Sequence, residues 1–85
     1  MPYVLVRGSP GVANTKVYGL PVHEAHRISQ HLRPGPVNDQ KDELTFYNSP
    51  VYLMNQLEYH FGYRVVACGA QGESLQPVWT LARSM

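Results

Sequence analysis

The segment from residue 49 to residue 81 constrains the fold most, because its pattern predicts a helix, a tight turn and two strands. Ser49 is typical of the position before a helix, and Pro50 is typical of the first helical position. Four apolar side chains follow at helical spacing: Leu53, Met54, Leu57 and Phe61. Gly62 stands where a helix-ending glycine is expected. The segment therefore begins with an amphipathic helix.

Two strands are predicted after this helix. Residues 63–67 are aromatic and β-branched, which favours a strand. Gly69, Gln71 and Gly72 indicate a turn, and residues 75–82 favour a second strand that carries Trp79. Because a helix with one apolar face must cover another layer, the segment predicts an α+β fold.

The chain before residue 22 alternates between strand and loop patterns. Residues 1–7 predict a strand with Val4 and Val6 on one side and Tyr3 and Leu5 on the other. Since both sides are apolar, we expect this strand to be covered twice or to lie at a subunit contact. Residues 8–21 predict a turn-rich loop, with a short strand at residues 16–18.

Residues 22–47 favour a short helix, a loop and a strand. The helix is expected over residues 22–32, after Pro21 and before the Arg33–Pro36 stop. Its expected inner side consists of Val22, Ala25, Ile28 or Ser29, and Leu32. Residues 37–43 predict a polar loop, and residues 44–47 predict a strand.

The length of 85 residues predicts a single domain, residues 1–85. A hydrophobic content of 44% with only 15% charged residues argues against disorder and for apolar surface that meets another chain. A net charge of +1 gives no indication of nucleic-acid binding. A small sheet leaves unpaired edges, and pairing between subunits is one way to cover them, so we expect a homo-oligomer.

The setting is expected to be cytoplasmic. No signal-peptide pattern is evident, and no segment approaches the roughly 20 apolar residues that cross a membrane. The single cysteine, Cys68, has no partner for an internal disulfide. Because it lies in an apolar strand pattern, we interpret it as a small buried hydrophobic residue.

Three histidines, His23, His26 and His31, fall on the predicted short helix, beside Glu24. Their spacing differs from the HExxH pattern that places two imidazoles around a catalytic metal. A metal site needs three or four ligands, so we expect none here and interpret this side of the helix as a solvated polar face.

Catalytic residues are not expected either. The serines lack the context of a nucleophile, and the glycines of residues 69–72 do not form a phosphate-binding loop. One enzymatic alternative stays open: after removal of Met1, Pro2 would be an N-terminal amine that could act as a general base. Small tautomerases use this logic, and their chains also begin Met-Pro before a strand.

Aromatic residues are frequent for so small a chain, with six tyrosines, two phenylalanines and one tryptophan. Some of them must pack in the core, but aromatic side chains are also enriched at protein interfaces. Tyr52 and Tyr59 point away from the apolar stripe of the predicted helix, so we expect them at an interface.

Taken in order, several segments resemble the GTP cyclohydrolase I feedback regulatory protein family. The resemblance covers residues 1–6 and 44–81. It rests on Met1-Pro2-Tyr3-Val4-Leu5-Val6, Phe46-Tyr47, Leu57-Glu58, Phe61-Gly62-Tyr63-Arg64-Val65-Val66, Gly72-Glu73-Ser74-Leu75 and Val78-Trp79-Thr80-Leu81. Between residues 8 and 43 only residues 28–32 are comparable. This chain departs from the family by Glu73 in place of a glutamine and by the extra Gln76-Pro77 before the last strand.

The resemblance implies a small α+β subunit, with two helices packed on an antiparallel sheet, that assembles into a ring-shaped homopentamer. It implies no catalytic residue, no metal and no cofactor. Two pentamers would cap decameric GTP cyclohydrolase I, with tetrahydrobiopterin favouring an inhibited complex and phenylalanine a stimulated one. A small amino-acid-binding module that serves another enzyme stays an alternative.

The expected phenylalanine site and partner interface combines two loops. The first is the flexible segment Ser9, Pro10, Gly11 and Val12. The second is the turn Gly72, Glu73, Ser74 and Leu75. We expect backbone groups of these loops to hold the amino and carboxylate ends of the effector.

Overall fold

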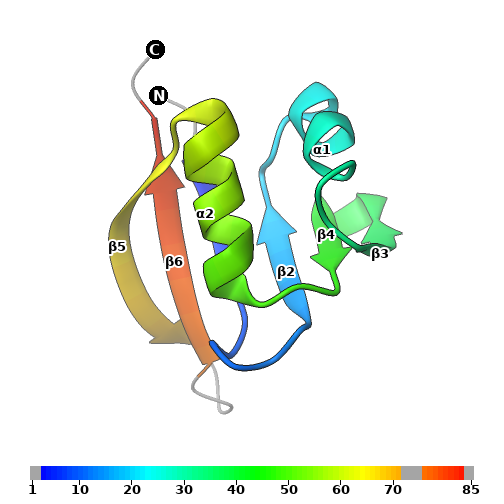
Figure 1. The fold of residues 1–85 in the computed structure, drawn as a ribbon. Helices are drawn as coiled ribbons and strands as arrows, with labels where there is room; N and C mark the ends of the chain where they lie inside the picture. Colours follow the sequence, from blue (N-terminus) through cyan, green and yellow to red (C-terminus); the bar gives the residue numbers. More distant parts are fainter. Residues whose placement is uncertain (1–2, 72–75, 84–85) are drawn as a thin grey trace.

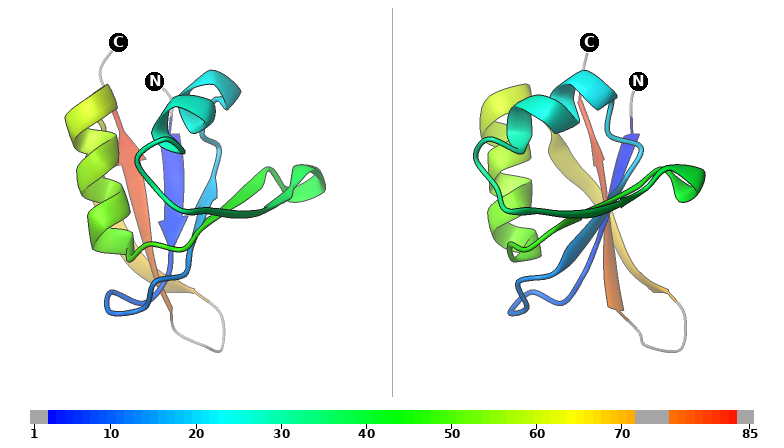
Figure 2. Two further views of the ribbon diagram at one scale, coloured as in Figure 1. Left: turned by 45° about the vertical axis from the view of Figure 1, so that its right-hand side comes forward. Right: turned by 90° about the vertical axis from the view of Figure 1, so that its right-hand side faces the viewer.

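The computed structural model describes residues 3–71 and 76–83. One antiparallel sheet of six strands, in the order β3-β4-β2-β1-β6-β5, carries both helices on the same face (Figures 1 and 2). The elements in chain order are β1 (Tyr3–Arg7), β2 (Thr15–Tyr18), α1 (Val22–Ile28), β3 (Pro34–Asn38), the 3-10 turn η1 (Asp39–Lys41), β4 (Glu43–Phe46), α2 (Pro50–Phe61), β5 (Arg64–Gln71) and β6 (Gln76–Ala82). The expected α+β architecture is confirmed.

The core lies between the helices and one face of the sheet. Val4 and Val6 of β1 lie on one side, as predicted, and are fully buried, whereas Tyr3 and Leu5 on the other side are exposed. Leu53 and Leu57 of α2 pack against these strands. The expected cover on both faces of β1 is not present within the described chain, because both helices lie on one side (Figure 2).

Helix α2 follows its local sequence signals. The Ser49 hydroxyl accepts a hydrogen bond from the backbone N–H of Tyr52, and Pro50 occupies the first turn. Gly62 ends the helix with φ +76°, a conformation that a side chain would strain. Tyr52 and Tyr59 are exposed, 46% and 83% respectively, so they point away from the core, and their place at an interface stays a prediction.

Helix α1 is shorter than predicted, and its inner side agrees with the prediction except at Val22: Ile28 and Leu32 are buried, and Ala25 packs against the core. It ends at Ile28, and its buried residues are Glu24 and Ile28. Val22, expected inside, is 85% exposed. The physical reason is that Glu24 has buried polar partners, described below, and a charged group can be buried where such partners offset its desolvation.

Strand β3 occupies part of the region expected to be a stop and a polar loop. It pairs with β4, with an irregular register between Pro34 and Val37. Proline lacks a backbone N–H and is tolerated where a strand has only one neighbour, so the two prolines of β3 fit an edge strand.

Strand β5 is longer than expected. Gly69 and Gln71, predicted in a turn, belong to the strand, and the predicted turn residues 72–75 lie outside the described residues. Cys68 is exposed, which corrects the expectation that it is buried. Because β5 is an edge strand that lies beside α2 rather than under it (Figure 1), the apolar pattern of the strand did not indicate burial.

Candidate functional site

The loop Ser9–Val12 connects β1 to β2 at one end of the sheet. Arg7 pairs with Val78 in the register of β1 and β6, and the Gly8 N–H donates a 3.3 Å hydrogen bond to the Pro77 carbonyl oxygen. The loop therefore lies at the end of the sheet where β6 begins. Since Gln76 pairs with Gln71, β5 ends there too.

The base of this loop is fixed and its tip is exposed. Gly8 is buried, and a Cβ there would lie 3.0 Å from Cγ of Pro50. The Thr15 hydroxyl donates a 2.7 Å hydrogen bond to the Asn48 carbonyl oxygen, which ties the other end of the loop to the start of α2. Between them, the Val12 N–H donates to the Ser9 carbonyl oxygen at 3.0 Å, and the Val12 side chain is 51% exposed.

The second half of the expected effector site, Gly72 to Leu75, lies outside the described residues. The departure Gln76-Pro77 is described and forms the start of β6. Pro77 has no N–H to donate, but its carbonyl oxygen accepts the hydrogen bond from Gly8. That the Ser9–Val12 loop and residues 72–75 meet around an effector stays a prediction. The end of β1, the end of β5 and the start of β6 lie at the same end of the sheet.

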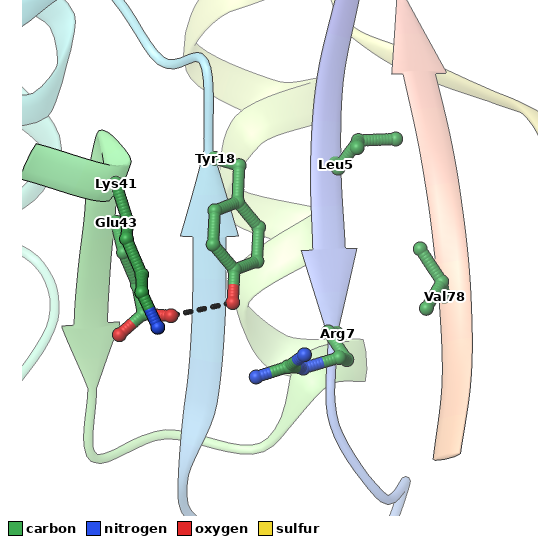
Figure 3. Close-up of a pocket in the computed structure, with 6 residues that line it drawn as sticks. All are labelled: Leu5, Arg7, Tyr18, Lys41, Glu43 and Val78. Atoms are coloured by element: carbon green, nitrogen blue, oxygen red, sulfur yellow. Dashed lines mark hydrogen bonds between the residues drawn. The ribbon is translucent and has the colours of Figure 1, made fainter. Parts of the chain in front are cut away.

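A pocket that the sequence did not predict lies on the face of the sheet opposite the helices. Its volume is about 320 Å³. Figure 3 shows it with α2 behind the strands. Six residues from β1, β2, η1, β4 and β6 line it: Leu5, Arg7, Tyr18, Lys41, Glu43 and Val78.

Tyr18 and Glu43 form one wall of this open-face pocket. They are opposite each other in the register of β2 and β4, and the Tyr18 hydroxyl donates a 2.5 Å hydrogen bond to Oε2 of Glu43 (Figure 3). Burial and this hydrogen bond raise the pKa of Tyr18. The same bond lowers the pKa of Glu43, and the nearby cations Lys16, Arg7 and Lys41 lower it further. At neutral pH the wall therefore consists of a phenol and a carboxylate anion.

Arg7 contributes a positive charge with an incomplete set of contacts. Its guanidinium carbon lies 5.6 Å from the centroid of the Tyr18 ring. Its Nε is buried and has no hydrogen-bond acceptor within the part of the chain that the structure describes. None of the ion pairs among the described residues includes Arg7. The pocket thus combines charges and hydrogen-bonding groups with the apolar side chains of Leu5 and Val78, an arrangement suited to binding.

Sequence reasoning missed this pocket because its residues come from separate strands. The alternation of β1 could have placed Arg7 on the same face as Tyr3 and Leu5. The contact of Tyr18 with Glu43, by contrast, depends on the register between β2 and β4, which no local pattern supplies.

A second polar cluster lies on the helix side and centres on Glu24, which is 3% exposed. Its Oε1 accepts a 2.9 Å hydrogen bond from the Tyr63 hydroxyl, and its Oε2 pairs with the Arg83 guanidinium. Burial and the hydrogen bond to Glu24 raise the pKa of Tyr63 to about 12. The hydrogen bond to Glu24 also raises the pKa of Arg83. The cluster ties α1 to the start of β5 and the end of β6.

The expected solvated face of α1 is therefore correct for His23 and His26, which are exposed, and wrong for Glu24. His31 lies beyond the end of α1, stacked on His60 of α2 with 4.3 Å between ring centroids. Among residues 3–71 and 76–83, no group of three or more His, Cys, Asp or Glu side chains is arranged to hold a metal ion.

No protein-family model matches the chain, and no curated protein matches it. Among the described helices, none has the length and apolar character needed to cross a membrane. Pro2 lies outside the described residues, so its use as a general base stays an untested prediction.

Proposed function

We propose that this protein is a non-enzymatic regulator of GTP cyclohydrolase I. The observation that supports the proposal is the ordered resemblance of residues 1–6 and 44–81 to the feedback regulatory protein family. In the fold, the described parts of these segments correspond to β1, β4, α2, β5 and β6. The shared residues thus belong to the strands and helix that build the core rather than to one local motif.

The proposed mechanism needs differential affinity and no reactive group. An effector shifts an equilibrium only to the extent that it binds one state of the complex more tightly than another. Phenylalanine would stabilise a stimulated complex, and tetrahydrobiopterin would stabilise an inhibited one. If the effector pocket is completed where two proteins meet, each bound effector adds to the stability of the complex by mass action.

The proposed contact surface is the end of the sheet that carries the Ser9–Val12 loop. Its exposed tip leaves Pro10, Gly11 and Val12 free to meet a partner, while the buried Gly8 holds its base. Residues 72–75, which stand between β5 and β6 in the sequence, are the proposed second half of the phenylalanine site.

Assembly into a homopentameric ring is part of the proposal, and the number five comes from the family. The two edges of the sheet differ in a way that favours one of them for subunit contacts. β3 has five residues and two prolines, whereas β5 has eight residues without proline and exposes Val65 and Val66. Because an unblocked edge strand can pair with another chain, we place a subunit contact along β5. The proposed setting is the cytoplasm.

The activity of GTP cyclohydrolase I at subsaturating GTP tests this function. With the protein present, phenylalanine should raise the activity and tetrahydrobiopterin should lower it; each effect should be small without the protein. A Val12→Asp substitution should raise the protein concentration needed for half-maximal stimulation about fivefold or more, because it places a charge in the contact surface.

Val22→Asp is the matched control, because Val22 is also exposed but lies on α1, away from the Ser9–Val12 loop (Figure 1). It should leave both effector responses unchanged. If wild-type protein alters neither response of the enzyme, the proposed function is wrong. If the two aspartate variants behave alike, the function stands but its assigned surface is wrong.

A further inference from the structure

The open-face pocket holds a guanidinium that the rest of the described chain does not pair. Arg7 is half-buried, and the packing around its stem leaves Nε inaccessible to water and without an acceptor. Leaving a buried donor without a partner is energetically unfavourable. Figure 3 shows the guanidinium extending from β1 toward β2, near the hydroxyl end of Tyr18. Because Nε is inaccessible, an anion in the pocket would meet the terminal Nη groups of this guanidinium, which belongs to the pocket lining.

The charged side chains around the pocket carry a net positive charge, which also favours an anion. Three cations, Arg7, Lys16 and Lys41, are close enough to lower the pKa of the single carboxylate, Glu43. One oxygen of Glu43 is already occupied by the Tyr18 hydroxyl. Lys16 donates a 2.8 Å hydrogen bond to the Thr45 hydroxyl, which leaves Arg7 and Lys41 as the cations that line the pocket.

The remaining lining is apolar. Leu5 and Val78 lie beside each other on β1 and β6, at the end of the pocket away from Glu43 (Figure 3). A volume of about 320 Å³ lies at the lower end of the range of small-molecule sites. A ligand that fits this division has one negative end and one small apolar body.

We propose that the open-face pocket binds a small organic monocarboxylate, with its carboxylate at Arg7 and Lys41 and its apolar body on Leu5 and Val78. Guanidinium and carboxylate match in shape and can form two parallel hydrogen bonds. Glu43 disfavours a second negative charge at that wall, which selects against dicarboxylates. The inference goes beyond the proposed function, because it needs neither GTP cyclohydrolase I nor the Ser9–Val12 loop.

Titration of the isolated protein, followed by NMR, tests the inference with a matched pair of probes. The carboxylate 4-methylpentanoate should shift the signals of Leu5, Arg7 and Val78 in a saturable manner. Its neutral analogue 4-methylpentanamide, which has the same apolar body, should bind at least about tenfold more weakly, as expected for loss of a charged hydrogen-bonding partner. Equal binding of the acid and the amide would overturn the proposal.

Two substitutions that each remove one positive charge distinguish binding in the pocket from a general electrostatic effect. Arg7→Gln should weaken 4-methylpentanoate binding about tenfold or more. Arg64→Gln, at an exposed position of β5, should leave it unchanged. Lys41→Gln, on the exposed turn η1, should weaken binding about two- to threefold without affecting the fold, so it remains informative if Arg7→Gln unfolds. Equal effects of Arg7→Gln and Arg64→Gln, or no effect of Lys41→Gln, would overturn the assignment.

The carboxylate could instead come from an acidic side chain of a second copy of this chain. Light scattering on wild-type protein and the Lys41→Gln variant distinguishes the two sources. An unchanged mass together with weaker 4-methylpentanoate binding supports a free acid as the ligand. A lower mass for the variant, with no saturable binding of the free acid to wild-type protein, would assign the pocket to a subunit contact and overturn the proposal.

Discussion

The two faces of the sheet differ although their residues alternate along the same strands. Val4 and Val6 of β1 are fully buried under the helices, whereas Tyr3 and Leu5, whose side chains are also large and mainly apolar, are 58% and 39% exposed on the other face. The apolar character of the helix side is explained by the fold. That of the open face is not, so we interpret it as surface that serves binding.

The polar groups of the two faces differ in whether their hydrogen-bonding partners lie within the fold. On the helix side, buried Glu24 is paired with both Tyr63 and Arg83. On the open face, the buried Nε of Arg7 has no acceptor among the described residues. One face is a completed network and the other is incomplete. Substitutions on the helix side should therefore change stability, and substitutions on the open face should change binding.

The same substitution on the two faces should show the largest difference. Leu57→Ala on α2 removes a side chain that is 1% exposed and should lower the free energy of unfolding by about 2–5 kcal/mol. Leu5→Ala on the open face should cost about 1 kcal/mol or less, since that side chain is already partly in water. Chemical denaturation measures both. Similar losses for the two variants would show that the open face is also part of the stabilising core.

Two tyrosines, one on each side of the sheet, allow the two faces to be compared by measuring stability at alkaline pH. The pKa of Tyr63 is raised to about 12, so the unfolded chain releases this proton first. The resulting stabilisation is complete below about pH 10, amounts to about 2–3 kcal/mol, and is lost as the pH rises from about 10 through 12. In unfolding measurements across this range, Tyr63→Phe should remove most of the pH dependence.

Tyr18→Phe on the open face is the matched variant for that titration. The pKa of Tyr18 is also raised, but the residue is only partly buried, so its removal should flatten the pH dependence less. If Tyr63→Phe and wild type lost stability in parallel between pH 10 and 12, the network around Glu24 would not stabilise the protonated phenol.

The smallest expected effect comes from alanine substitutions of two glycines, one at the end of α2 and one on the edge strand β5. Gly62 ends α2 with φ +76°, so Gly62→Ala should cost about 1 kcal/mol. Gly69→Ala, on the exposed edge strand β5, has open space for the new methyl group and should be neutral or slightly stabilising. Thermal unfolding resolves this difference. A larger cost at Gly69 would reveal a contact on β5 that the isolated subunit does not make.

Local signals predicted some elements well because they act within a few residues. Ser49, Pro50 and Gly62 specify the start and end of α2 through backbone capping, and all three positions agree with the prediction. The alternation of β1 likewise predicted that Val4 and Val6 share one face and that Tyr3 and Leu5 share the other. These features depend on no contact with a distant part of the chain.

The predictions that proved wrong concern features that depend on contacts between residues far apart in the sequence. The burial of Glu24 on α1 depends on Tyr63 and Arg83, which lie far along the sequence from it. The exposure of Cys68 depends on the edge position of β5, and the open-face pocket depends on the register of four strands, β1, β2, β4 and β6, and on the neighbouring turn η1. In the expected effector site, the sequence specified an exposed loop at Ser9–Val12, and residues 72–75 lie outside the described residues.

The mass of the complex with GTP cyclohydrolase I tests the central claim most directly. The two proteins are mixed, separated by size exclusion and measured by light scattering, with phenylalanine, with tetrahydrobiopterin and with neither. The proposal predicts a particle heavier than either protein alone whose amount rises with each effector. Separate elution of both proteins at unchanged masses under all three conditions would contradict it.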